Sequence, residues 1–252
     1  MTRRLLAAVA AIAAMVTTLS AQRQAAAAEI KVLASNGARG ALVELGRQFQ
    51  DAAGHKLAMD FDVVAPLKRR IDAGETFDLA ILSPAAIDDL IKQGKVAADT
   101  RTNFARTGLA VGVRKGAPKP DIGSAEAFKR AMLDAKSVAH SREGGSGVSF
   151  LAILDRLGIA AEMKPKLKTY VVGGPVPTAE ADLVVSGAAP ILAMPDTELV
   201  AWLPSEIQAY VFFTAAVSST AKDPGAAKAL LRNLTAPAAA PVLKAKGLEP
   251  AE

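Results

Sequence analysis

The stretch that decides the fold of this chain is residues 213–250, FTAAVSSTAKDPGAAKALLRNLTAPAAAPVLKAKGLEP. It begins inside a long apolar strand at 207–217 and continues into leucine- and alanine-rich segments at 223–233 and 237–246. The apolar spacing of both segments is typical of amphipathic helices. A strand followed by two closing helices indicates an α/β fold, and we expect this strand to return to the sheet that opens the chain.

Strand and helix patterns alternate through the first half as well. Residues 30–35 and 77–82 read as buried strands, and Leu57, Met59 and Phe61 alternate with polar or small residues as another. Helices are predicted at 38–52, 66–73 and 84–93. Alternation with such short connections predicts a mostly parallel sheet that helices cover on both faces.

The second half has a similar pattern. A strand is predicted at 109–113, and Ser124 is placed to cap the helix that follows. The later expected elements are a strand at 136–139, a helix at 148–157, a strand at 170–172, a helix at 179–185 and a strand at 191–193. This half therefore forms a second α/β unit.

The whole pattern predicts an α/β fold of two lobes, each a mostly parallel sheet flanked by helices. Lobe 1 would comprise residues 29–110 plus 212–252, and lobe 2 residues 111–211. Crossover strands are expected near 109–114 and 207–213. Ligands of open α/β sheets bind beyond the carboxyl ends of the strands, and two lobes joined in this way can close on a solute by hinge motion.

Residues 1–28 have the form of a cleavable signal peptide. Two arginines precede the apolar run 5–16, and the alanines at 26–28 offer an A-x-A cleavage site. The apolar run is shorter than the roughly 20 residues that a membrane-spanning helix needs. We therefore expect export to the periplasm and a mature chain that begins near Glu29.

Composition excludes several classes of protein. The chain has no cysteine, so it can form no disulfide, zinc–thiolate site or nucleophilic thiol, and it cannot be a lipoprotein. The formal charge of +5 includes three arginines of the signal segment, and removing them leaves +2 with acids and bases interspersed. Aromatic residues are few and there is no basic stripe, so we expect no nucleic-acid partner.

Four blocks of the chain stand out, and they are KDPGAAKALLRNLTAP (222–237), FDLAILSPAAIDDLIKQGKV (77–96), LAVGVRKGAP (109–118) and GVSFLAILDRLGI (147–159). These blocks resemble the molybdate-binding group of the periplasmic solute-binding proteins of ABC importers. They occur in the family's order across most of residues 29–252. The resemblance implies the two-lobed type II fold, an anionic ligand such as molybdate, tungstate or a carboxylate, and an ABC permease of the inner membrane as partner.

The chain departs from this family where the family's hydroxyls hold molybdate. Ser35 and Asn36 lie near the first family serine but in a shifted register, and residues 62–66 carry no hydroxyl at the second. The family tyrosine aligns near Met194 or Pro195, so its hydroxyl is absent as well. The apolar replacements favour a ligand with an apolar part, such as a small organic acid.

The remaining anion-binding chemistry is that of helix amino-termini, whose unpaired amides hold anions without a charged side chain. Arg39, in the first turn of a predicted helix, is a candidate for bidentate pairing with the anion. Asp78 is expected to be structural and to bond nearby backbone. The predicted ligand contacts are Ser35, Asn36, Gly37, Arg39, Val64, Ala65, Ser146, Gly147, Val176, Thr178 and Met194.

The sequence thus predicts a monomeric periplasmic receptor that captures a small anion by lobe closure, without catalysis, cofactor or metal. One alternative is a partner-binding protein on the same fold that has lost its ligand. Another is a hydrolase, but GGSGV (144–148) lacks the final glycine of a nucleophile elbow. His55 and His140 also fall in different predicted lobes, so no catalytic triad is apparent.

Overall fold

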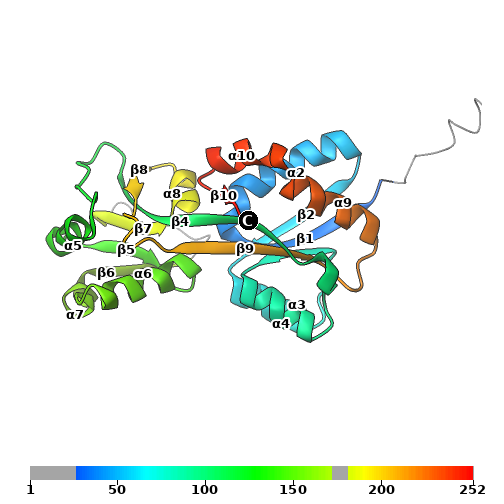
Figure 1. The fold of residues 1–252 in the computed structure, drawn as a ribbon, viewed down its shortest axis with the longest axis horizontal. Coiled ribbons are helices and arrows are strands. Elements are labelled where there is room, and N and C mark those ends of the chain that lie inside the picture. The colour runs from blue at the N-terminus through cyan, green and yellow to red at the C-terminus, as the bar shows by residue number, and fades with distance from the viewer. Residues whose placement is uncertain (1–26, 172–180, 252) are drawn as a thin grey trace, which may run out of the picture.

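Two lobes joined by two long strands make up the computed structural model, which describes residues 27–171 and 181–251 (Figure 1). The sheet order is β2-β1-β3-β9-β4-β7-β5-β6, with β8 and β10 paired to β4. The predicted signal segment lies almost entirely outside the described residues. The strands are β1 (Glu29–Ser35), β2 (Lys56–Asp62), β3 (Leu79–Leu82), β4 (Thr102–Arg114), β5 (Val138–Ser141), β6 (Leu167–Tyr170), β7 (Leu183–Gly187), β8 (Thr197–Trp202), β9 (Tyr210–Val217) and β10 (Glu249–Pro250).

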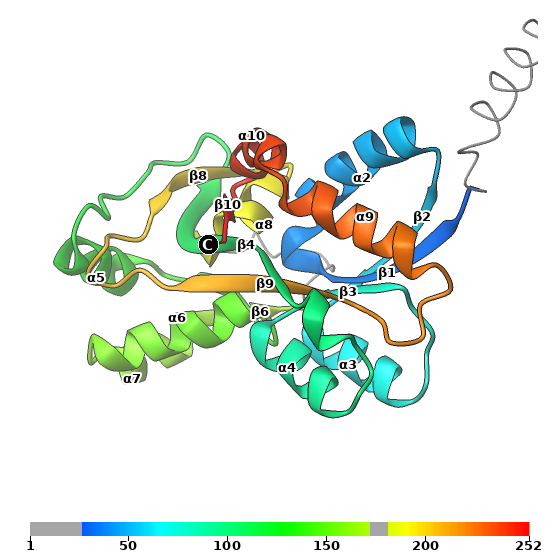
Figure 2. The ribbon, with the colours of Figure 1, turned by 45° about the vertical axis from the view of Figure 1, so that its right-hand side comes forward.

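Lobe 1 is built on the parallel strands β2, β1 and β3 and is covered on both faces. The helices α2 (Arg39–Ala53), α9 (Pro224–Thr235) and α10 (Ala240–Ala245) lie on one face, and α3 (Val64–Asp72) and α4 (Pro84–Lys92) lie on the other (Figures 1 and 2). Within β1, Val32 packs toward the first group of helices and Leu33 toward the second. Because successive side chains of a strand point to opposite faces, both faces need apolar residues, and the strand reads as a continuous apolar run.

Lobe 2 repeats this plan with the parallel strands β6, β5 and β7. The helices α5 (Ala125–Asp134), α6 (Gly145–Arg156) and α7 (Ala160–Met163) enclose the main core of this lobe, where Phe128 and Phe150 are fully buried. The short helix α8 (Ala188–Ala193) packs through Ile191 against β4 in a separate cluster. Each lobe therefore has its own hydrophobic core.

The antiparallel strands β4 and β9 run side by side from one lobe to the other (Figure 1). β4 pairs with β9 and β10 in lobe 1 and with β7 and β8 in lobe 2. Thr107, near the middle of β4, donates its hydroxyl to the carbonyl of Gly247 at 2.9 Å and accepts the amide of Ala189 at 3.3 Å. The two-lobed fold with crossover strands that the sequence predicts is confirmed, and the domain boundaries given above remain a prediction.

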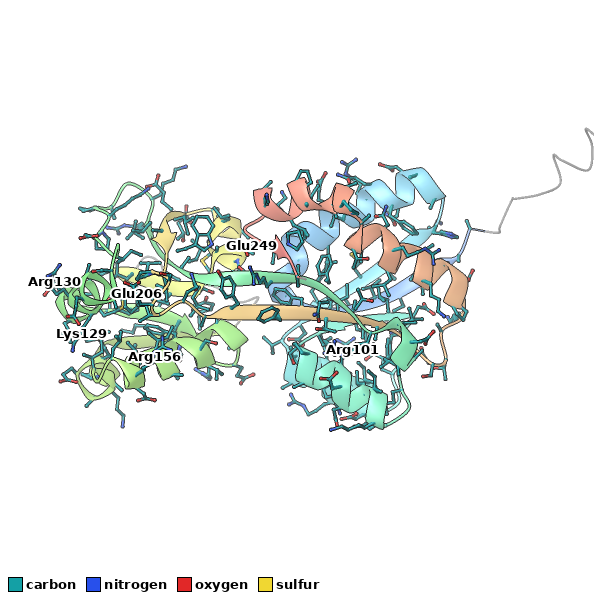
Figure 3. All side chains as sticks on the ribbon, in the orientation of Figure 1. Arg101, Lys129, Arg130, Arg156, Glu206 and Glu249 are labelled. Atoms are coloured by element: carbon teal, nitrogen blue, oxygen red, sulfur yellow. The ribbon has the colours of Figure 1, made fainter. Side chains whose placement is uncertain are left out.

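The C-terminal strand is tied down beside this crossing. Figure 3 shows Glu249 next to the crossing strands, and its Oε2 accepts a hydrogen bond of 2.9 Å from Nε of Arg106 on β4. The guanidinium of Arg106 also lies 4.4 Å from the ring centroid of Tyr210 on β9. The end of the chain is thus fixed to both crossing strands.

Two element predictions are wrong in lobe 2. Residues 183–185 belong to the strand β7 and not to a helix, and residues 191–193 belong to the helix α8 and not to a strand. Every residue of β7 is buried, and a fully buried strand has the same apolar pattern as a buried helix. Residues 179 and 180, the first two of the predicted helix, lie outside the described residues.

No helix among the described residues is both long and apolar enough to cross a membrane. In the same part of the chain, no three His, Asp or Glu side chains are grouped where they could hold a metal ion.

Candidate binding cleft between the lobes

A cavity of about 1190 Å³ lies between the lobes. Lobe 1 contributes Ser35 and the first turns of α2 and α3, and lobe 2 contributes the first turn of α6 and the whole length of α8. Thr107 and Phe213, from the two crossing strands, also line it. The cavity therefore opens at the carboxyl ends of strands in both lobes, where open α/β sheets bind their ligands.

Several helix amino-termini meet at this cavity. The residues that precede α3, α4, α6 and α8 are Val63, Ser83, Gly144 and Gly187, and all four line it. Only Ser83 accepts a hydrogen bond from the first turn of its own helix, at 3.4 Å from the amide of Ala86. No side chain caps α3 or α6, so their first amides remain available to an anion, whereas the amide of Arg39 at the start of α2 bonds the carbonyl of Asn36 and that of Ala189 in α8 bonds Thr107.

A chain of four hydroxyls forms part of the lobe 2 wall. Tyr170 donates to Oγ of Ser186 at 3.3 Å, Ser186 lies 3.4 Å from Oγ of Ser146, and Ser146 lies 3.5 Å from Oγ of Ser141. Tyr170, Ser146 and Ser186 line the cavity, whereas Ser141 is buried behind them. Burial raises the pKa of Tyr170, and the bond to Ser186 opposes this only in part, so the phenol stays protonated as a hydrogen-bond donor at neutral pH.

A further hydroxyl of the cavity wall lacks a partner. Oγ1 of Thr197, at the start of β8, is the one buried side-chain oxygen or nitrogen without a hydrogen bond among the described residues. A buried hydroxyl without a partner costs free energy, and a polar ligand atom beside it would remove that cost. This makes the lobe 2 wall suited to a polar ligand.

His140 lies behind the hydroxyl chain and supports it. Its ring is packed against Phe150 at a centroid distance of 5.6 Å, and Nδ1 lies 3.0 Å from the carbonyl oxygen of Ser141. Burial lowers the pKa of His140, which keeps the imidazole neutral at pH 7. In the part of the chain that the structure describes, no hydrogen bond joins His140 to Ser146 or to a carboxylate, so these residues do not form a catalytic triad.

The cations of the cavity all come from lobe 1. Lys68 is neutralised by Asp72 and Asp89, each with an oxygen 2.7 Å from Nζ. Arg39 and Lys246 are exposed, and neither has a carboxylate within 4 Å among the described residues. The guanidinium of Arg39, which lines the cavity, lies 5.1 Å from the centroid of the Phe61 ring on β2.

The carboxylates of the cavity wall are those of Glu143 and Asp196, which lie on loops of lobe 2 and are exposed. Other charges of that lobe, such as those of Lys129 and Arg130 on α5, lie at its far end, away from lobe 1 (Figure 3). The two walls thus differ in charge: unpaired cations face the cavity from lobe 1, and acids face it from lobe 2.

Most of the ligand contacts predicted from the sequence line this one cavity. They are Ser35, Asn36, Gly37, Arg39, Val64, Ala65, Ser146 and Met194. Gly147 is buried behind the wall, and a Cβ on it would lie 1.9 Å from the carbonyl oxygen of Ser141. The need for glycine at this position therefore comes from the backbone of β5. Val176 and Thr178 lie outside the described residues. Contact of any of these residues with a ligand remains a prediction.

Sequence reasoning missed several residues that line the cavity. They include Lys68, Ser83, Thr107, Tyr170, Ser186, Thr197 and Lys246. Ser186 was missed because residues 183–185 were predicted to be helical. The residue in fact lies near the carboxyl end of the strand β7, directly before the helix α8. Tyr170 ends β6 in the same way and supplies a tyrosine hydroxyl away from the position where the family alignment expects one.

Comparisons with known proteins place the chain in a family. Residues 30–249 match the family model described as "Bacterial extracellular solute-binding protein". The aconitate isomerase of a Pseudomonas species is 31% identical over 230 residues, which cover 88% of this chain and 87% of that protein. The molybdate-binding protein of Azotobacter vinelandii is 25% identical over 88% of this chain and 90% of that protein.

Solved structures agree with this assignment at the level of the fold. The Azotobacter vinelandii periplasmic molybdate-binding protein superposes with a TM-score of 0.74 at 17% identity in the structural alignment, covering 88% of this chain and all of that chain. Because the family model matches nearly the whole described chain, the protein belongs to the bacterial extracellular solute-binding proteins.

Proposed function

We propose that this protein is a periplasmic solute-binding protein that captures a small organic anion, a carboxylate, between its lobes. The captured solute would then be presented to an ABC permease by the closed form. The observation that carries the proposal is the meeting of uncapped helix amino-termini with a chain of neutral hydroxyls at one interlobe cavity. This arrangement offers hydrogen-bond donors to negative charge.

The apolar part of the cavity lining favours an organic anion over molybdate. Apolar side chains such as Val64 and Leu192 line the cavity beside the donors. A compact tetrahedral oxyanion has no apolar part to place against them, whereas an aliphatic carboxylate does.

The test is a thermal-shift screen of the chain from Glu29 onward, refolded to remove any bound solute. The panel contains molybdate, tungstate, sulfate, phosphate and a set of aliphatic and aromatic carboxylates. A ligand present at 100 times its dissociation constant stabilises the protein by about 2.7 kcal/mol, which is readily detected. We expect stabilisation by carboxylates. Stabilisation by molybdate alone would overturn the carboxylate assignment, and no response to any anion would favour the partner-binding alternative.

A second candidate function is isomerisation of a small unsaturated carboxylate. The specific observation in its favour is the named aconitate isomerase, which is 31% identical over 88% of this chain. The refolded protein of the thermal-shift screen would be incubated with cis- or trans-aconitate, and interconversion of the two isomers would be followed by proton NMR. Conversion that is lost in Tyr170→Phe and Ser186→Ala variants would make this protein an enzyme. Binding of aconitate without conversion would leave capture as the function.

A further inference from the structure

We infer that the captured solute carries two separated anionic groups, one held by the hydroxyls of lobe 2 and the other by Arg39 and Lys246 of lobe 1. The inference rests on the proposed capture of a carboxylate and specifies the class of carboxylate. It follows from the different chemistry of the two walls of the cavity.

The lobe 2 subsite is made of neutral donors. Three contacts link the four hydroxyls of Tyr170, Ser186, Ser146 and Ser141, and each contact uses one proton. When Ser141 donates to Ser146 and Ser146 to Ser186, the proton of Ser186 at the cavity wall remains for a ligand. The first amides of α6 and the unpaired hydroxyl of Thr197 border the same wall. A single carboxylate or oxyanion can be held here without any cation.

The lobe 1 subsite has the opposite character. Arg39 occupies the first position of α2, where the positive end of the helix dipole disfavours a cation. Lys246 lies at the end of α10, close enough to the start of α2 that its Cδ would be 3.8 Å from a Cβ on Gly40. Two cations beside the same helix amino-terminus repel one another and the dipole, and a bound anion between them relieves both effects.

Lys68, the third cation of the lobe 1 wall, differs from Arg39 and Lys246 because it is paired with carboxylates. It lines the same cavity, but Asp72 and Asp89 neutralise it. Arg39 and Lys246 form no ion pair within 4 Å among the described residues, and Glu44, the carboxylate whose charge acts on Lys246, is itself paired with Arg47, so a ligand anion is the group that can pair with both cations. Glu143 and Asp196 line the cavity from lobe 2, so they would repel a second ligand carboxylate from that side and direct it to lobe 1.

The experiment is a calorimetric titration with three probes of similar chain: butyrate, glutarate and propane-1,2,3-tricarboxylate. The variants are Arg39→Gln, Lys246→Gln and the double variant. The matched controls are Arg47→Gln, an exposed arginine two turns further along α2, and Lys244→Gln, an exposed lysine on α10. Neither control residue lines the cavity. Circular dichroism and the melting temperature show whether each variant folds.

We expect glutarate or the tricarboxylate to bind the wild-type protein at least about tenfold more tightly than butyrate. The double variant should lose about that factor for the polycarboxylates and stay within about twofold for butyrate, with both controls unchanged. A Tyr170→Phe variant should instead weaken all three probes by a similar factor, because the lobe 2 subsite is common to them.

Two results would overturn the inference while leaving anion capture intact. One is butyrate binding as tightly as the polycarboxylates. The other is a loss in the double variant that is equal for all three probes, because this would mean that Arg39 and Lys246 act by pairing with Glu143 and Asp196 when the lobes close. Absence of binding by every anion would instead overturn the proposed function itself.

Discussion

Replacing Gly147 by alanine tests how tightly the first turn of α6 is fixed to β5. A Cβ at this position would lie 1.9 Å from the carbonyl oxygen of Ser141 and 2.8 Å from its Oγ. An ordinary C···O contact is at least about 3.3 Å, so the helix start must move by roughly 1.4 Å. Ser141 cannot easily yield, because it is buried and paired in register with Tyr170.

Overpacking of this kind costs about 1–3 kcal/mol, and alanine recovers about 0.5–1 kcal/mol of helix propensity. Because the clash is with backbone, we take the overpacking cost at about 3 kcal/mol, and subtracting the recovered propensity leaves a net loss of about 2 kcal/mol. For a chain of this size that lowers the melting temperature by about 4–8 °C. The shift also moves Ser146 away from Ser141 and Ser186, so ligand affinity should fall.

The assay is scanning calorimetry together with the calorimetric titration, and the matched control for stability is Gly40→Ala. A Cβ on Gly40, inside α2, meets only the flexible Cδ of Lys246 at 3.8 Å. This variant should therefore be more stable than the wild type by about 0.5–1 kcal/mol. If Gly147→Ala melts with or above the wild type and binds normally, the packing of α6 against β5 does not hold the hydroxyl chain in place.

Three other predictions concern stability. Hydrogen bonds from Arg70 and Lys31 lower the pKa of Glu75 to about 2. The stabilisation that the ionised Glu75 gives the folded protein is therefore complete above pH 4.5 and is lost as the pH falls toward 2. Urea midpoints measured between pH 5 and 3 should fall less steeply in Glu75→Gln than in the wild type. The buried carboxylate of Asp78 accepts hydrogen bonds from the amides of Lys31 at 2.8 Å and Lys222 at 2.7 Å. Asp78→Ala should therefore lower the free energy of unfolding in urea by about 3 kcal/mol, and a loss below about 1 kcal/mol would contradict this reasoning. Ser124→Ala removes the cap bond to the amide of Ala127 at 3.1 Å and should cost about 1 kcal/mol of stability, measured by thermal melting. Ligand affinity should stay unchanged because Ser124 does not line the cavity. A change in affinity would contradict this reasoning.

Much of lobe 1 follows from local sequence patterns. The apolar runs at 30–35 and 77–82 correspond to β1 and β3, and Asp78 bonds backbone amides as expected. Ser124 caps α5, as its position before an amphipathic segment predicted. These features depend on residues close together in the chain, which is why periodicity and capping signals can reveal them.

The missed part of the candidate site depends on contacts distant in the sequence. The strand β7 is buried on all sides, so its sequence has no alternation that separates it from a helix, and Ser186 went unrecognised with it. Lys246 lines the cavity only because α10 packs against the start of a helix some two hundred residues earlier. No pattern within residues 240–246 could predict that these residues contact the start of α2.

The position of β9 has a consequence for how the molecule is made. β3 and β4 come from the first half of the chain, yet the strand that pairs with both of them, β9, begins only at Tyr210. A nascent chain that stops before this residue exposes two unpaired strand edges, and such edges favour aggregation. Contacts this distant in the chain also form slowly, because a long loop must close first. During synthesis the sheet of lobe 1 thus stays incomplete until β9 has left the ribosome.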